Sequence, residues 1–563
     1  MCRDLLDEGM VSKTMAIGGK VTGPAHENMI IGSHRMRIFA MRFPPMIFVI
    51  PALMVALLML APIGYLIVRA TDSGTAIPDT LIRARTFVVT RNTALLAASV
   101  AVSSSLIAVP LAWLTTRANL PNQRFWTVVA ALPLVIPSYV GALTIVAAMG
   151  PRGIVQGWLE GPFGIERLPS IYGFLGSWWA LTLFSYPYVY LGVQAAFRGI
   201  DPALEEAARS LGLGPYRSFF RVMLPQLRPA IAAGALLSAL YTVSDFGVVS
   251  LMRFDVFTRA IYVQYQSSFD RTAAASLALV LVAFTIMILA LEWWVRGRAR
   301  QYRVATGAAR TVRRVDLGRW KWLGVGYCAV IFVSSVVLPL LVLIYWMMNG
   351  TSTGEAVGQF WGQAVNSASV SLVAGVVTVV LALPTAVLSV RYRNRFTTLL
   401  ERQAYLGYAL PGVAIALAFV YIGARYVPSL YQTIWLLLIG YAVRFLPQAL
   451  GAERVSLLQI SPRVEEASRT LGENVLGTLR RVTLHLARPG LVAGFGLVAL
   501  TVMKELPVTM MLAPIEFETL ATGIWQATQT GAYGKAAAPA LILIAVSAIP
   551  SFLLSRRELD QAG

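Results

Sequence analysis

Long apolar stretches with few or no charged residues occur throughout this sequence, and no other feature limits its possible folds as strongly. A helix needs about 20 mostly apolar residues to cross a bilayer. Six such stretches occur in each half of the chain: 43–68, 92–116, 125–151, 168–197, 229–252 and 271–292, then 322–347, 366–390, 403–424, 431–448, 489–512 and 536–555. Only 13% of the residues are charged, against about 25% in soluble domains. We therefore predict an all-α polytopic membrane protein with about twelve transmembrane helices.

The basic residues are distributed unevenly between the predicted loops. With the N-terminus placed in the cytoplasm, 34 of the 47 Lys and Arg residues fall on the cytoplasmic side and 11 on the outer side. This asymmetry follows the positive-inside rule and predicts that both termini are cytoplasmic. The net charge of +20 then reflects topology and attraction to anionic lipid headgroups. It gives no reason to expect a nucleic-acid partner.

The two halves of the sequence resemble each other in the same order. "NTALLAASVAVSSSLIAVPLAWLTTR" (92–117) aligns with "NSASVSLVAGVVTVVLALPTAVLSVR" (366–391), and Leu132-Pro133 aligns with Leu410-Pro411. Because each half has an even number of spans, the halves have parallel topology and a pseudo-twofold axis along the membrane normal. The predicted division is a tail (1–42), a first domain (43–295), a basic linker (296–321), a second domain (322–556) and a tail (557–563).

A polar segment repeats 260 residues apart on the predicted cytoplasmic side. "IDPALEEAARSLGLGPYRSFFRVMLPQLRPA" (200–230) aligns without a gap with "ISPRVEEASRTLGENVLGTLRRVTLHLARPG" (460–490); we call these the first and second repeated loops. Asp201-Pro202 and Ser461-Pro462 each combine an N-cap residue with a proline suited to the first helical position. Each loop therefore predicts a short capped helix, a glycine turn and a second short helix that ends near Leu224-Pro225 or Leu484-His485.

One such loop would most simply be an amphipathic segment lying on lipid headgroups. Two copies at matching topological positions favour a docking element instead. The small residues Ala207-Ala208 and Ala467-Ser468 would allow another surface to approach closely.

The repeated loops resemble the EAA signature of ABC importer permeases. That signature has Glu-Ala-Ala, three residues, glycine, nine residues, then an aliphatic residue, any residue and Leu-Pro. The second loop departs from it at Ser468 and at His485. In this family the segment forms a coupling helix that inserts into the ATP-binding subunit. The resemblance thus implies that the chain docks onto two ATPase subunits through a set of loop residues: Glu205, Glu206, Ala207, Ala208, Gly212, Glu465, Glu466, Ala467, Ser468 and Gly472.

Further stretches resemble the fused ferric-iron permeases of bacteria. They are "LPLVIPSYVGAL", "VSDFGVVSLMRFDVFTRAIY", "ALPGVAIALA" and "MKELPVTMMLAPIEFETLAT". The resemblance implies an inner-membrane subunit that receives ferric iron from a periplasmic binding protein. Fused permeases for thiamine, and permeases for polyamines or other small solutes, share parts of this plan and stay as alternatives.

The sequence offers no catalytic constellation of its own. Gly18-Gly19-Lys20 and Gly534-Lys535 lack the spacing and the hydroxyl residue of a phosphate-binding loop. The three histidines are too scattered for a metal-ligand cluster. We therefore expect no cofactor on this chain and no enzymatic activity of its own, with ATP and Mg²⁺ bound by the partner subunit.

Two acids in equivalent places are the candidate pathway residues. Asp245 and Glu505 are 260 residues apart, late in the fifth predicted span of each half. Intramembrane charges usually face a bundle interior or cavity and mark a transport route. The alternative is a structural ion pair between Glu505 and its neighbour Lys504. Arg444 is expected to reach the cytoplasmic edge of the membrane, and Pro133, Pro137 and Pro411 are expected to kink their helices.

Two other protein classes also fit twelve spans. A secondary transporter would have a duplicated core, and a passive channel or scaffold would be similarly apolar. Neither needs two matched docking loops, so both rank below the importer permease.

Overall fold

The computed structural model describes residues 44–71, 83–200, 207–208, 210–267, 271–298, 315–349 and 356–560. The predicted N-terminal tail and most of the basic linker lie outside these residues. Helices make up the described chain, and its sole β contact is an isolated bridge between Ala118 and Val315. The all-α prediction is confirmed.

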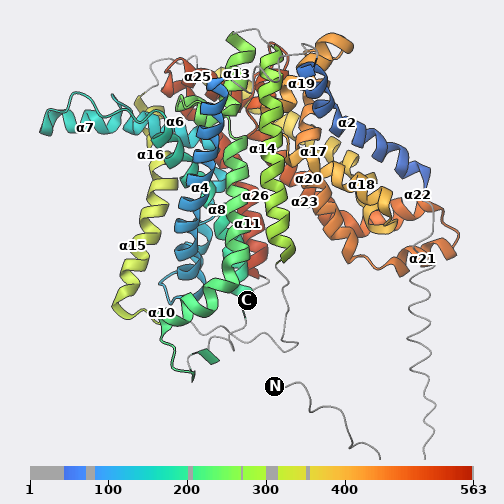
Figure 1. Ribbon diagram of the computed structural model, residues 1–563, viewed down its shortest axis with the longest axis horizontal. Helices are drawn as coiled ribbons and strands as arrows, with labels where there is room; N and C mark the ends of the chain where they lie inside the picture. The colour runs from blue at the N-terminus through green and yellow to red at the C-terminus, as the bar shows by residue number, and fades with distance from the viewer. Residues whose placement is uncertain are drawn as a thin grey trace, which may run out of the picture.

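The helices of each half pack into a bundle (Figure 1). The first half contains α2 (Met46–Thr71), α4 (Ala84–Arg117), α5 (Gln123–Val129), α6 (Ser138–Met149), α7 (Ile154–Phe163), α8 (Phe174–Gly199), α10 (Pro215–Ser218), α11 (Leu224–Ser244), α12 (Gly247–Leu251), α13 (Phe257–Ser267) and α14 (Arg271–Arg298). The second contains α15 (Lys321–Phe332), α16 (Leu338–Asn349), α17 (Ala356–Arg391), α18 (Arg395–Ala404), α19 (Gly412–Tyr426), α20 (Ile434–Gln459), α21 (Pro462–Thr470), α22 (Val475–Thr478), α23 (Leu484–Met503), α24 (Pro507–Leu512), α25 (Leu520–Gln529) and α26 (Tyr533–Asp560).

The described residues contain nine helices long and apolar enough to cross a membrane, or ten if the bent pair α18–α19 is one span. This is fewer than the twelve predicted. The predicted fourth span is α8, which is 26 residues long but rich in Ser, Tyr and Trp and largely buried by its neighbours. The twelfth corresponds to α26, which is apolar over Tyr533–Ala548. The multi-pass class is confirmed, and the count of twelve stays a prediction.

The third and fifth predicted spans of each half are broken helices. In the third span, short 3-10 turns at Leu132–Val135 and Tyr405–Tyr408 precede Pro137 and Pro411, after which α6 and α19 begin. Proline removes a backbone donor and restricts the preceding residue, so it separates helical segments. The expected disruption at these prolines is confirmed.

These breaks correct one part of the repeat alignment. Pro137 and Pro411 both immediately precede the helix that follows the break, so Ile136-Pro137 pairs with Leu410-Pro411. The predicted pairing of Leu132-Pro133 was wrong by four residues. The corrected offset of 274 equals that of Asn92 with Asn366, so the second and third spans align without a gap.

The first helix of each half packs on the opposite half as well as on its own, where α2 contacts α14 and α16 contacts α26. α2 lies against α17, α18 and α19, and Tyr65 of α2 stacks on Tyr421 of α19 with ring centroids 4.6 Å apart. In return, α15 and α16 lie against α4 and α6, and the Tyr327 hydroxyl donates to the carbonyl of Ile107 at 3.0 Å. The two halves are therefore interlocked and not merely adjacent.

Matched polar contacts hold the segment after each fifth span. Asn92 donates through Nδ2 to the carbonyl of Asp255, and Asn366 donates likewise to Glu518, both at 3.0 Å. Since these asparagines were aligned from sequence, their contacts confirm that the two halves share one architecture.

Candidate functional site

Asp245 and Glu505 lie in the breaks of the two fifth spans. Asp245 separates α11 from α12, and Glu505 lies between α23 and α24. Asp245 Oδ1 accepts the backbone N–H of Val248 at 2.8 Å, and Glu505 Oε1 accepts that of Val508 at 3.4 Å. Each carboxylate therefore satisfies a free donor at the start of the short helix that follows, as an N-cap residue does.

The broken third spans pack against these acids. The Ser138 hydroxyl, at the start of α6, donates to Asp245 Oδ2 at 2.5 Å. Its counterpart at the start of α19 is Gly412, where a Cβ atom would lie 2.8 Å from Glu505 Oε1. Each half-helix start thus meets the acid of its own half, and glycine leaves room in the second half for a larger side chain.

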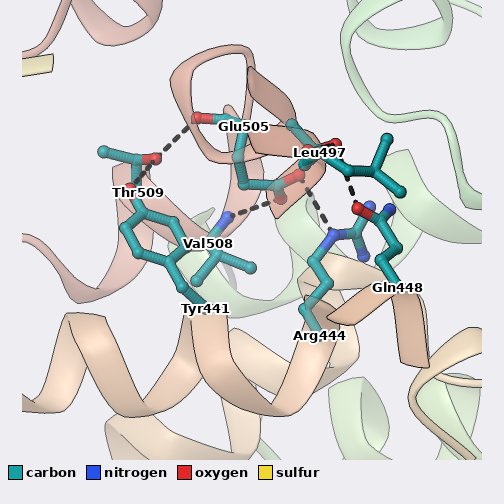
Figure 2. Close-up of polar contacts among 8 residues, drawn as sticks. Tyr441, Arg444, Gln448, Leu497, Glu505, Val508 and Thr509 are labelled. Atoms are coloured by element: carbon teal, nitrogen blue, oxygen red, sulfur yellow. Dashed lines mark hydrogen bonds and ion pairs between the residues drawn. The ribbon is translucent and has the colours of Figure 1, made fainter. Parts of the chain in front are cut away.

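That larger side chain is Arg444 of α20. Its Nε lies 3.0 Å from Glu505 Oε2, and the two side chains are 18% and 7% exposed (Figure 2). The expectation that Arg444 reaches the cytoplasmic membrane edge was wrong, because a nearby buried carboxylate offers the guanidinium a charge-assisted hydrogen bond. A structural ion pair at Glu505 was anticipated, but its partner is Arg444 and not the adjacent Lys504.

Lys504 instead connects the two halves. Its Nζ donates to the carbonyl of Leu134 at 3.1 Å, within the 3-10 turn of the broken third span of the first half. Leu134 is four residues before Ser138, which binds Asp245, so this contact joins the break that holds Glu505 to the segment that holds Asp245. The acids therefore belong to one polar cluster at the centre of the chain, which also includes Tyr441 hydrogen-bonded to Thr509 at 2.6 Å.

The cluster is asymmetric in charge. Position 184 is the counterpart of Arg444 at the 260-residue offset, and it holds Phe184, which packs on Gly141. Among the described residues, Asp245 forms hydrogen bonds with Ser138 and Val248 but no ion pair. Only the second acid thus has a cation supplied by its own half.

The second repeated loop forms the predicted helix and glycine turn. Ser461 precedes Pro462 at the start of α21, although the serine side chain makes no capping hydrogen bond. Gly472 has φ of +92°, and its counterpart Gly212 has φ of +80°. Both therefore occupy the left-handed region, which confirms the predicted C-cap glycines. Asp201–Glu206, including the predicted residues Glu205 and Glu206, lie outside the described residues.

The predicted second helix of each loop does not end at Leu224-Pro225 or Leu484-His485. In the first loop, α10 passes through a π-helical turn at Phe219–Met223 directly into α11. The second loop repeats this with a turn at Leu479–Thr483 leading into α23. Pro225 directly follows the π-helical turn, in which the Leu224 N–H reaches back to the carbonyl of Phe219, so the missing N–H of proline falls where the α-helical hydrogen-bond pattern is already shifted. Each loop is therefore continuous with the fifth span of its half.

The predicted loop residues divide into an inner and an outer set. Glu465 is 6% exposed and forms an ion pair with Arg391 Nη2 at 3.0 Å, while Thr483 donates to it at 3.0 Å. Ala208 and Ser468 are buried as well, Glu466 is half-buried, and the exposed set consists of Ala207, Gly212, Ala467 and Gly472. Glu465 thus fastens α21 to the end of α17 and is unavailable to a partner surface.

Sequence reasoning missed the anchoring arginines and two exposed leucines. Arg391 also donates to the carbonyl of Ile460 at 3.1 Å, and its counterpart Arg117 donates to the carbonyl of Phe197 at 3.0 Å. Leu211 and Leu471, which precede the two turn glycines, are 82% and 85% exposed. The repetition of both pairs in the sequence was the signal that could have identified them.

The two repeated loops lie on opposite sides of the bundle. α10 lies at the lower left of the bundle, and α21 and α22 lie at the right (Figure 1).

The described residues contain no group of three or more His, Cys, Asp or Glu side chains arranged to hold a metal ion. The central cluster therefore has charges and hydrogen-bonding groups but no ready-made ligand set.

The model of one protein family matches both halves of the chain. It is described as the binding-protein-dependent transport system inner membrane component, and it covers residues 108–301 and again 378–556. The chain belongs to this family. Each match omits the first helix of its half, which is the helix that packs on the opposite half.

Individual relatives agree with this result. The Fe(3+)-transport system permease protein FbpB 2 of Haemophilus influenzae is 35% identical over 520 residues, which cover 92% of this chain and 99% of the relative. The ferric transport system permease protein FbpB of Actinobacillus pleuropneumoniae is 25% identical over 81% of this chain and 69% of its own length. The sulfate transport system permease protein CysT of Escherichia coli is 30% identical over 42% of this chain and 86% of its own length. The chain thus also resembles a permease about half its own length.

Proposed function

We propose that this chain is the permease subunit of an ATP-driven importer that moves ferric iron across a bacterial inner membrane. The observation that carries the proposal is the 35% identity to a ferric-iron permease across 99% of that relative's length. A match over the whole length includes both halves and the polar cluster between them, where a substrate would pass.

The importer requires two kinds of partner. A periplasmic binding protein would deliver iron to the outer face, and two ATP-binding subunits, one for each repeated loop, would bind ATP and Mg²⁺. ATP hydrolysis would occur on those subunits and not on this chain. Both termini would be cytoplasmic, which places the repeated loops on the side where ATP is available.

The exposed loop residues would couple ATP hydrolysis to transport. Leu211 and Leu471 would insert into the two ATP-binding subunits, with Glu206 and Glu466 beside them. Because each loop continues into a fifth span, movement of the loop would displace the break that holds Asp245 or Glu505. This connection gives a direct mechanical route from the ATPase to the central cluster.

Asp245 and Glu505 would line the pathway. Their charges favour a cationic solute, while the Arg444 partner weakens the attraction of Glu505 so that a cation is not retained. Weak contact suits a transport route, because a tight metal site would hold the ion.

Uptake in living cells tests the substrate. We expect deletion of the gene to abolish uptake of radioactive ferric iron and the intact gene to restore it, with labelled thiamine uptake unchanged. If iron uptake persisted in a strain without a second iron importer, the iron assignment would fail. A selective loss of thiamine uptake would instead support the thiamine alternative, and a result independent of ATP would favour a secondary transporter.

A further inference from the structure

One helix breaks the symmetry between the halves. The halves are 274 residues apart at Pro137 and Pro411 but 260 apart at Ile200 and Ile460, so the first half has 14 additional residues between the third and fourth spans. They form an excursion that contains α7. In the second half only Val427–Thr433 connects α19 to α20.

The excursion is an ordered structure. Its base is closed by a hydrogen bond from the Leu168 N–H to the carbonyl of Pro151 at 3.1 Å. Inside it, Gln156 donates to the carbonyl of Ile165 at 2.9 Å and to Glu160 at 3.1 Å. Gly164 has φ of +64° and ends α7 with a left-handed turn. The chain therefore folds back along the polar side of this helix.

The other side of α7 is apolar. At 100° per residue, one half of the helix circumference carries Ile154, Val155, Trp158, Leu159 and Phe163. Trp158 and Phe163 are 69% and 72% exposed. An ordered helix with two large exposed aromatic side chains on one face indicates an interaction surface.

The position of α7 identifies the surroundings of that face. By length and composition, α6 and α7 together could form one span, Ser138–Phe163. In Figure 1, however, α7 runs across the direction of the spanning helices and projects sideways from the end opposite α10. Its first residue, Ile154, packs against the small buried cluster of Ala147, Ala148 and Val342, which Leu338 and Trp346 of α16 also contact. On the same part of α16, Tyr345 and Met348 are 42% and 71% exposed, as expected of side chains that face lipid. The apolar face of α7 is therefore continuous with the lipid-facing surface of α16.

We propose that α7 is an interfacial helix that lies in the headgroup region of the outer leaflet. Trp158 and Phe163 enter the boundary with the acyl chains, and Glu160 faces the water side, while Gln156 is buried beneath the returning chain. Tryptophan is enriched at this depth, and an amphipathic helix binds there through its apolar area. A binding protein seated over the pseudo-twofold axis would be far from a helix that points away from that axis.

Spin labels on the full-length chain in nanodiscs of phosphatidylethanolamine and phosphatidylglycerol test this proposal. In a background with Cys2→Ser and Cys328→Ala, one variant carries Trp158→Cys and the matched control carries Glu160→Cys on the opposite face of α7. We expect the label at position 158 to collide mainly with oxygen, which partitions into lipid. The label at position 160 should collide mainly with a water-soluble nickel chelate.

Equal access of the nickel chelate to both positions would overturn the proposal. The proposal would also fail if position 158 became protected from the nickel chelate only after the binding protein is added, because α7 would then contact that protein. A second measurement keeps the native cysteines: brominated lipids should quench less of the tryptophan emission in Trp158→Phe than in the wild type. Unchanged quenching would also contradict the proposal.

Discussion

At the scale of single residues, the Arg444–Glu505 pair dominates the central cluster. Removing one partner of a buried ion pair leaves an uncompensated charge and costs about 3–5 kcal/mol. We expect Arg444→Leu to lower the free energy of unfolding, measured in mixed micelles, by about that amount. In the double variant Arg444→Leu with Glu505→Leu, the free energy of unfolding should fall by less, since no charge is left unpaired. An equal loss in both variants would show that the ion pair is unimportant.

Asp245 differs from Glu505 in having no cation from its own half. We expect Asp245→Asn to preserve the hydrogen bonds with Ser138 and Val248 and therefore the fold, but to reduce iron uptake by removing the charge. The control is Ser138→Ala, which keeps the charge and removes one hydrogen bond. Normal uptake by Asp245→Asn would exclude a pathway role for this carboxylate.

At the scale of elements, each repeated loop exposes a leucine side chain, and the second loop buries Glu465. We expect Leu211→Asp combined with Leu471→Asp to prevent co-purification of the ATP-binding subunit without lowering the melting temperature. Ile515→Asp is the matched control, because Ile515 is 82% exposed outside both loops. Retention of the ATP-binding subunit by the double variant would contradict the docking role.

Glu465 should act differently from Glu466. We expect Glu465→Gln to weaken the attachment of α21 to α17 by breaking the ion pair with Arg391, and so to increase proteolysis of the second loop. Glu466→Gln is the control, since Glu466 is half-buried and shares no ion pair with Arg391 in the described residues. Equal proteolysis of both variants would show that the ion pair does not anchor α21.

Local sequence signals predicted much of the loop and little of the cluster. Proline and glycine act on their own backbone, so the start of α21 and the turns at Gly212 and Gly472 could be read from the sequence. The Arg444–Glu505 pair joins residues 61 positions apart, and such a contact depends on how helices pack. For the same reason the sequence placed Arg444 at the membrane edge.

At the scale of the whole molecule, the exchange of first helices could not be predicted from the sequence. Apolar stretches indicate where helices lie along the chain but not which neighbours they contact, since lipid-facing and helix-facing side chains are both apolar. The twofold repeat gave the correct architecture of each half. It did not indicate that α2 packs on α17–α19.

The exchange predicts that the two halves hold together without the covalent linker. We expect a chain cut between residues 305 and 306 and produced as two pieces to co-purify, because the first helix of each piece also packs on the other piece. Removing α2 from the first piece should reduce the yield of the complex. Independent purification of the two pieces would contradict the interlocked arrangement.

The most direct test of the central claim is iron transport by the purified components. We would reconstitute this chain with its ATP-binding subunit in liposomes and add a binding protein loaded with radioactive ferric iron. The account predicts iron accumulation that requires ATP and is lost with the Leu211→Asp and Leu471→Asp double variant. ATP-dependent accumulation of another solute, with none of iron, would contradict it.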